Sequence, residues 1–328
     1  MKEGVIVANK NLNEARKNKN DEFYTQLSDI ENELKHYIKY FRGKVVYCNC
    51  DDPVQSNFWR YFHLNFTYFG LKKLIATHYR VEGGAYTMEY TGENDLNIYE
   101  GKVKNLKGTG DFRDEECIEI LMQADIVCTN PPFSLFREYL KQLIEYDKKF
   151  VIIGPTNALT YKEVFPLLRD NKVWLGNGFL AGNAYFSIPI DCVNNYNDKV
   201  YNSKTGFVKF RNCKWYTNLD IVKRHEPLEL LEHYTPEKYP KYDNYNAINV
   251  DRVHDIPCDY DGVMGVPITF MDKYCPEQFE LMNCNDCRVN DSVPIRENIV
   301  IKDKYGSING KCPYQRILIR KIKSNITC

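Results

Sequence analysis

Apolar and polar positions along the first 175 residues follow the order strand, loop, helix. Short apolar runs rich in β-branched residues predict buried strands; these cover 44–48, 71–77, 126–128, 150–154 and 173–175. Apolar residues at helical spacing predict helices at 28–41, 58–66, 115–122, 135–146 and 161–169. A strand, a polar loop, a helix and a strand in succession form a βαβ unit. The pattern therefore predicts an α/β fold with a mostly parallel sheet and helices on both faces.

The pattern changes in the second half of the chain. Beyond about residue 180 the apolar segments are shorter and rich in aromatic residues, and the regular α/β alternation has ended by about 220. We therefore expect three parts: a polar N-terminal segment (1–20), an α/β domain (21–220) and a further region (221–328). The polar, glycine-containing stretch at 80–110 is expected to be a loop or a hairpin.

The predicted strand at 126–128 ends in an unusual bracket, Asn130-Pro131-Pro132-Phe133. Neither proline can donate a backbone hydrogen bond and both fix φ, so the turn is stiff. The Asn130 amide oxygen and the Pro131 carbonyl could each accept one hydrogen from an exocyclic amine on a planar ring. Phe133 could stack on that ring. Asn-Pro-Pro-Phe resembles the motif of amino-methyltransferases, although a Pro-Pro turn can also simply end a strand.

Charge neither requires nor excludes a nucleic-acid partner. Lys and Arg number 44 and so do Asp and Glu, giving a net charge of zero. From 296 to 323, however, eight basic residues stand against two acidic ones. Nucleic-acid binding needs a basic face rather than a basic protein.

Targeting and redox signals indicate the cytoplasm. The chain has no run of 18 apolar residues, which argues against a membrane span, and its polar N-terminus lacks the apolar core of a secretory signal. Twelve cysteines without such a signal favour free thiols in a reducing compartment. Cys284-x-x-Cys287 with Cys275 and Cys312 could form a zinc site, but the irregular spacing favours unpaired cysteines, and we expect no metal.

Several motifs in this order resemble the EcoRI-type family of adenine-specific DNA methyltransferases. The likeness runs from about residue 15 to 323 and includes an unusual Cys-Asn-Cys-Asp-Asp-Pro loop. The segments that carry it are Asp21–Thr25, Val46–Pro53, Gly110–Phe112, Asn130–Phe133, Trp215–Asp220 and Gly265–Phe270.

The resemblance implies a class I methyltransferase (Rossmann-like) fold in 21–220, S-adenosylmethionine as the cofactor, and target recognition by 221–328. By position, residues Phe23, Tyr24 and Thr25 would contact the methionine part of the cofactor. Its amino acid end would be wrapped by the loop that contains Cys48, Asn49, Asp51 and Pro53. Asp111 would accept a hydrogen bond from the cofactor adenine, Phe112 would lie against that ring, and Asn130 would also face the cofactor.

Two departures from most class I enzymes affect these expectations. The loop after Cys48 has no glycine before Asn57, although glycines there usually allow close approach of the backbone. The next strand ends in Thr77-His78 rather than in an acid that could bind the ribose.

The implied mechanism is direct attack of the adenine nitrogen on the sulfonium methyl group. The base must first be flipped out of double-stranded DNA, and Phe133 would stack on one of its faces. Trp215 or Tyr216 is expected at the other face or in the core. Arg316 and Arg320 are expected to contact DNA phosphates.

Other targets stay open at this point. The same bracket would suit an RNA adenine or a glutamine side chain in a protein, and an inactive nucleic-acid-binding relative is a further alternative. We expect a monomer in the cytoplasm with no membrane association, and a cognate restriction endonuclease would fit the family.

Overall fold

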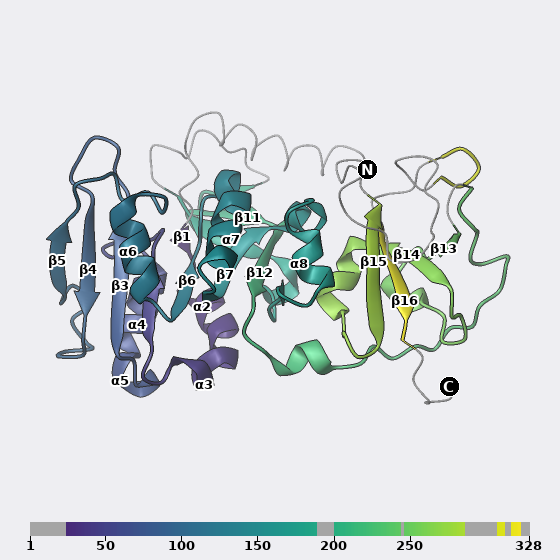
Figure 1. Ribbon diagram of the computed structural model, residues 1–328, viewed down its shortest axis with the longest axis horizontal. Coiled ribbons are helices and arrows are strands. Elements are labelled where there is room, and N and C mark those ends of the chain that lie inside the picture. The colour runs from purple at the N-terminus through teal and green to yellow at the C-terminus, as the bar shows by residue number, and fades with distance from the viewer. Residues whose placement is uncertain (1–23, 189–199, 244–245, 286–306, 312–315, 323–328) are drawn as a thin grey trace. The chain divides into compact units, whose positions relative to one another are not determined.

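The computed structural model describes residues 24–188, 200–243, 246–285, 307–311 and 316–322 (Figure 1). Phe23, Cys287 and Cys312 lie outside these ranges, as does the N-terminal segment. The chain divides into two compact units. The first comprises Met1–Thr156 and Gly176–Leu219, and the second comprises Asn157–Leu175 and Asp220–Cys328. Residues 157–175, which the sequence pattern placed in the α/β domain, thus belong to the second unit.

The first unit is built on a mixed sheet with the strand order β5-β4-β3-β2-β6-β7-β12. Its strands are β2 (Val45–Cys48), β3 (Lys73–His78), β4 (Tyr86–Tyr90), β5 (Lys102–Asn105), β6 (Ile126–Thr129), β7 (Lys149–Pro155) and β12 (Cys213–Thr217). The central pairs β3-β2, β2-β6 and β6-β7 are parallel. The outer pairs β3-β4, β4-β5 and β7-β12 are antiparallel. The predicted parallel pairing is confirmed for the centre of the sheet only, because hairpins and a returning strand flank it.

The parallel strands change winding direction between β2 and β6. The chain passes from β2 to its neighbour β3 on one side, and from β6 to its neighbour β7 on the other. Since parallel crossovers are right-handed, the connecting helices must cover opposite faces. In Figure 1, α6 and α7 lie in front of the sheet and α4 behind it. Ligands of such sheets bind outside the carboxyl ends of the strands at this switch point.

The helices of the first unit bury aromatic faces on the sheet. They are α2 (Leu27–Leu34), η1 (Lys35–Tyr37), α3 (Ile38–Phe41), α4 (Asn57–Leu64), α5 (Phe66–Phe69), α6 (Glu115–Gln123), η2 (Phe133–Leu135), α7 (Phe136–Glu145) and η4 (Leu180–Gly182). Phe41 packs edge-on against Phe62, with ring centroids 5.1 Å apart. Phe136, the first residue of α7, lies directly over Gly154 of β7, where an added Cβ would come within 2.2 Å of the ring. Only glycine allows α7 this close to the sheet.

A small antiparallel sheet completes the first unit, with the strand order β1-β9-β11-β10. Its strands are β1 (Tyr24–Thr25), β9 (Ala184–Ser187), β10 (Tyr201–Asn202) and β11 (Phe207–Phe210). Tyr24 of β1 is opposite Ser187 of β9. The aromatic-rich apolar segments noted beyond residue 180 include β9 and β11, whereas the pairing of β1 with β9 is long-range and had no local signal.

The second unit contains the sheet β13-β14-β16-β15. The sheet consists of β13 (Ala247–Asn249), β14 (Val263–Pro267), β15 (Phe279–Asn285) and β16 (Arg316–Lys321). The short strand β8 (Trp174–Leu175) also belongs to the residues of this unit but not to this sheet. Its helices are α8 (Phe165–Arg169), η6 (Val222–His225), η7 (Val253–Asp255) and η8 (Ile268–Lys273), and η3 (Thr156–Thr160) leads into it. Within the described part of the chain, none of the helices has the length and apolar character needed to cross a membrane.

Candidate active site

The loop after β2 and the bracket after β6 meet at the switch point through the carboxylate of Asp51. Its Oδ1 accepts a hydrogen bond of 2.7 Å from the Ser56 hydroxyl, and its Oδ2 accepts one from the Thr129 hydroxyl. The backbone N–H of Cys50 donates to the same Thr129 oxygen over 3.2 Å. Thr129 is the last residue of β6, so these bonds fix the two loops to each other.

Burial makes Asp51 an unusual carboxylate. The residue is only 8% exposed, and burial raises its pKa to about 6 although hydrogen bonds from Thr129, Ser56 and the backbone N–H of Asn130 oppose the shift. The group is thus mainly ionised at neutral pH and protonated in mild acid. Because it also contacts the backbone of Asn130, its charge state is coupled to the position of the bracket.

The bracket lies where the sequence predicted, directly after a buried strand at the ligand-binding edge. Asn130 and Pro132 are partly exposed, and Pro131 is buried. Phe133 is 4% exposed and begins the 3-10 turn η2 that leads into α7. With its ring buried, Phe133 does not present an open face for stacking in this conformation.

Several buried polar groups of the first unit have no hydrogen-bond partner among the described residues. They include the side-chain nitrogen of Asn49 and the hydroxyl of Thr25. Asn49 directly follows β2, and its side-chain oxygen accepts a hydrogen bond from the Tyr139 hydroxyl. Thr25 is held by a 2.7 Å hydrogen bond from the Asn57 side chain to its carbonyl. Since buried polar groups are normally satisfied, both positions fit a polar ligand.

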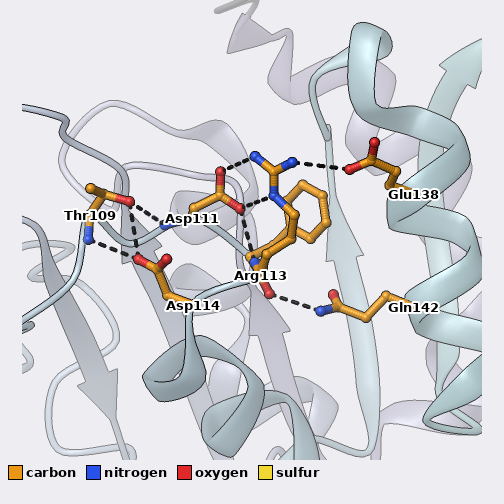
Figure 2. A network of polar contacts seen from close by, with 7 residues as sticks. Thr109, Asp111, Arg113, Asp114, Glu138 and Gln142 are labelled. Atoms are coloured by element: carbon orange, nitrogen blue, oxygen red, sulfur yellow. Dashed lines mark hydrogen bonds and ion pairs between the residues drawn. The ribbon is translucent and has the colours of Figure 1, made fainter.

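The Gly110-Asp111-Phe112 turn passes the end of β3 at close range. Gly110 has a φ of +77°, and a Cβ there would lie 2.6 Å from the carbonyl oxygen of His78, so both conformation and space require glycine. The Asp111 carboxylate is held by the Arg113 guanidinium at 2.7 and 2.8 Å (Figure 2). Burial alone would raise the pKa of Asp111, but the hydrogen bonds from Arg113 outweigh burial and lower it.

The same turn is tied to α7. Arg113 extends to Glu138 over 3.0 Å (Figure 2), and the Gln142 side chain donates to the carbonyl of Phe112 over 3.0 Å. The Phe112 ring is 4% exposed and packs edge-on against Tyr139, with centroids 5.0 Å apart. Since α7 continues from the bracket, one helix positions the bracket, the Asn49 amide and the 110–113 turn together.

A further cluster occupies the end of β3, where the sequence offered no acid. The Asp52 carboxylate is 3.3 Å from Nδ1 of His78 and accepts a 3.0 Å hydrogen bond from the Tyr86 hydroxyl. Asp52 thus brings a carboxylate to the strand end that lacks one. The contacts of Asp52 with His78 and Tyr86 join three separate segments, and no pattern in the sequence predicts them.

The remaining predicted cofactor contacts are placed differently from one another. Tyr24 is partly exposed on β1. Cys48 is fully buried within β2 and Pro53 is also buried, so these two could reach a ligand only through backbone atoms. Phe23 lies outside the described residues. The sequence did not single out Ser56, Thr129, Tyr139 or Arg113, although Thr129 adjoins the bracket and could have been suspected.

The expectation that Trp215 or Tyr216 faces DNA needs correction. Trp215 is 1% exposed and Tyr216 is fully buried. Trp215 stacks on Phe179, with centroids 5.5 Å apart, and the Tyr216 hydroxyl donates to the carbonyl of Pro155 over 2.9 Å. Both lie on β12, which pairs with β7, so their rings are part of the core.

Arg316 also occupies a different environment from the one expected. Its side chain is 7% exposed, and its Nε donates to the Asn249 side chain over 3.1 Å. Asp251 lies 3.5 Å from the same guanidinium. Arg320 is partly exposed and pairs with Glu280 at 2.9 Å. A buried Arg316 cannot contact phosphate in this conformation, because its guanidinium is held against Asn249 and Asp251 with 7% of the side chain exposed.

Comparison with known proteins identifies the family. A family model described as Adenine-specific methyltransferase EcoRI matches residues 11–322. The chain belongs to this family. The predicted family and the predicted methyltransferase activity are thereby confirmed.

Several curated relatives of this adenine methyltransferase match over almost their full lengths. Type II methyltransferase M.EcoRI of Escherichia coli is 49% identical, over 95% of this chain and 96% of the relative. M.MgeORF184P of Mycoplasma genitalium is 38% identical and M.MpnI of Mycoplasma pneumoniae 37%, each over 94% of this chain and 98% of the relative. No solved structure matches the chain.

Proposed function

We propose that this enzyme transfers a methyl group from S-adenosylmethionine to the exocyclic amine of an adenine flipped out of duplex DNA at a specific site. The observation that carries the proposal is the junction of Asp51, Thr129 and Asn130 at the switch point of the sheet. It places the Asn-Pro-Pro-Phe bracket at the edge where such sheets bind ligands. Curated relatives named Type II methyltransferases support DNA as the substrate.

The residues at this edge fit the cofactor. S-adenosylmethionine supplies an activated methyl group together with amino, carboxylate and adenosyl parts that need hydrogen bonds. Asn49 and Thr25 offer buried polar atoms that lack partners among the described residues, and both belong to segments that the family resemblance assigns to its methionine end. Asp52, with His78 and Tyr86, would face its ribose, and Phe112 would line its adenine side. This arrangement supports a class I methyltransferase fold for the first unit.

The bracket supplies the chemistry on the target side. The Asn130 side-chain oxygen and the Pro131 carbonyl would accept the two amine hydrogens, which orients the nitrogen and leaves its lone pair available for attack. No side chain needs to form a covalent bond with the substrate. Phe133 would have to turn its ring toward the flipped adenine, which implies a local change in η2 when DNA binds.

Target recognition is proposed for the second unit. Its sheet is separate from the parallel centre that carries the candidate site. Arg320 remains the proposed phosphate contact there, because it is partly exposed, whereas Arg316 is held in the interior. The monomeric state, the cytoplasmic location and a cognate restriction endonuclease stay predictions from the sequence.

The decisive experiment follows labelled methyl groups from S-adenosylmethionine into duplex DNA, RNA or a protein extract. We expect N6-methyladenine in duplex DNA alone, at a single sequence context, and transfer slowed by orders of magnitude in the Asn130→Ala variant. Label in RNA or in glutamine would overturn the DNA assignment. Undiminished transfer by Asn130→Ala would show that the reaction does not depend on the bracket.

A further inference from the structure

The second unit contains a cluster of three different metal-ligating side chains far along the chain from the candidate active site. His233, Cys258 and Asp259 bring one ligand atom each to within 4.8 Å of the others. Nδ1 of His233 is 3.7 Å from the Cys258 sulfur and 3.1 Å from Oδ2 of Asp259. In the described structure, Nδ1 of His233 therefore contacts both the Cys258 thiol and the Asp259 carboxylate.

Two of the three separations between these atoms match edges of a zinc tetrahedron, and the third lies within 4.8 Å. With Zn–S near 2.3 Å and Zn–N and Zn–O near 2.0 Å, tetrahedral angles place sulfur and nitrogen about 3.5 Å apart and nitrogen and oxygen about 3.3 Å apart. The two observed separations differ from these by a few tenths of an ångström. The ligand types also suit zinc, which binds thiolate, imidazole and carboxylate.

The backbone holds the two ligand segments together before any metal binds. Glu232 and Pro257 form a parallel β-bridge, and the N–H of Cys258 donates to the carbonyl of Glu232 over 2.8 Å. The N–H of Tyr234 donates to the other carboxylate oxygen of Asp259 over 2.7 Å, which leaves Oδ2 facing the histidine. Such prior ordering lowers the entropy lost on binding.

We propose that His233, Cys258 and Asp259 form a zinc site that joins 232–234 to 257–259, with water as the fourth ligand. On binding, the thiol proton of Cys258 is released to solvent, and the imidazole proton resides on Nε2 so that Nδ1 can coordinate. The exposed fractions of His233 and Asp259, 71% and 44%, leave room for the water. Lys321, at the end of β16, donates to the carbonyl of Cys258, so the metal would also steady that strand end.

The test uses the full chain after treatment with a chelator and titrates it with Co²⁺, followed by competition with Zn²⁺. We expect one equivalent of Co²⁺ to give the charge-transfer absorption of a thiolate ligand. Cys258→Ser should abolish that absorption. His233→Gln should weaken Zn²⁺ binding by at least about tenfold, since even outer partners of metal ligands contribute this much.

Matched variants separate this site from other thiols. His254→Gln removes a histidine of similar exposure, 69%, and should bind as the wild type does, as should Cys275→Ser and Cys287→Ser. His233 is exposed, so its replacement leaves no cavity, and circular dichroism will show whether each variant is folded. Absence of Co²⁺ binding, or binding that survives Cys258→Ser but is lost with Cys287→Ser, would overturn the proposal.

Discussion

The switch-point edge of the first unit and strand β16 of the second unit were both singled out by sequence motifs, yet they differ in structure. At the edge, polar side chains from Asp51, Thr129 and Asn49 converge, and the buried side-chain nitrogen of Asn49 lacks a partner among the described residues. In β16, the arginine that was expected to be functional is enclosed by Asn249 and Asp251. Topology dictates where a polar group can serve a ligand, whereas a local excess of charge does not show which way a side chain faces.

The largest effect is expected from the bracket. Asn130→Ala removes one of two acceptors for the target amine and should slow methyl transfer by about 10²–10³-fold, as for loss of a preorganised polar group in other enzymes. Cofactor affinity should change little. Single-turnover kinetics and calorimetry measure the two quantities. Asn202→Ala, at the exposed end of strand β10, is the matched control. Near-normal turnover in Asn130→Ala would show that Asn130 does not take part in the reaction.

The buried carboxylate at the edge should make stability depend on pH. The folded pKa of Asp51 is about 6, above the value of about 3.9 in an unfolded chain. Its contribution to the free energy of unfolding is therefore fully present below about pH 4 and is lost as pH rises through 6, by at most about 3 kcal/mol.

Asp51→Asn should remove this dependence. The variant's free energy of unfolding, relative to the wild type, should rise between pH 4 and pH 7 in urea titrations. Glu119→Gln, an exposed carboxylate on α6, should run parallel to the wild type. Parallel curves for Asp51→Asn as well would show that the carboxylate is not desolvated.

Substitution of Arg316 tests strand β16, the second of the two regions compared. Arg316→Met should lower the free energy of unfolding by about 2 kcal/mol, because Asn249 and Asp251 lose a charged hydrogen-bond donor. The slope of log K for DNA binding against log salt should not change. A slope reduced by about 0.9 would instead mean that Arg316 contacts a phosphate. Arg320→Gln, at the partly exposed position on the same strand, is the comparison variant for the slope.

The smallest effect concerns the turn at 110–113. Asp111→Ala should weaken S-adenosylmethionine binding by about 1.5 kcal/mol if its carboxylate accepts a cofactor hydrogen bond. Arg113→Gln should leave affinity nearly unchanged in that case, since the carboxylate stays in place. Equal losses in calorimetry from both variants would indicate that the ion pair only shapes the turn.

Much of the first unit could be predicted from the sequence because its signals are local. The apolar runs at β2, β6 and β7 and the helical spacing of α6 and α7 gave the elements nearly to the residue. At 80–110, where the sequence left a loop or a hairpin open, β4 and β5 form antiparallel pairs between neighbouring segments. The return of β12 to β7 could not be predicted, since these strands are distant in the chain. Helix α2 begins at Leu27 with Gln26 as its cap, one residue before the predicted start.

The candidate site was predictable where motif and topology agree. Asn49, Asp51 and Asn130 lie at the carboxyl ends of adjacent parallel strands, so a βαβ pattern was enough to bring them together. Ser56, Tyr139 and the Asp52–His78 pair depend on side-chain packing between segments, for which one sequence carries no signal. For Trp215 and Tyr216 the sequence left both a binding face and the core open, because an aromatic pair suits either environment.

Gly154 is a position at which a substitution would lower the thermal stability of the site, although the residue takes no part in the reaction. A single methyl group there would meet the Phe136 ring at 2.2 Å, and α7 would have to lift away from β7. That helix holds the bracket at its start, Tyr139 against Asn49, and Glu138 against Arg113. Gly154→Ala would thus loosen every side of the site at once without removing one of its polar groups. We expect Gly154→Ala to give a temperature-sensitive enzyme that is active at low temperature and inactive at higher temperature.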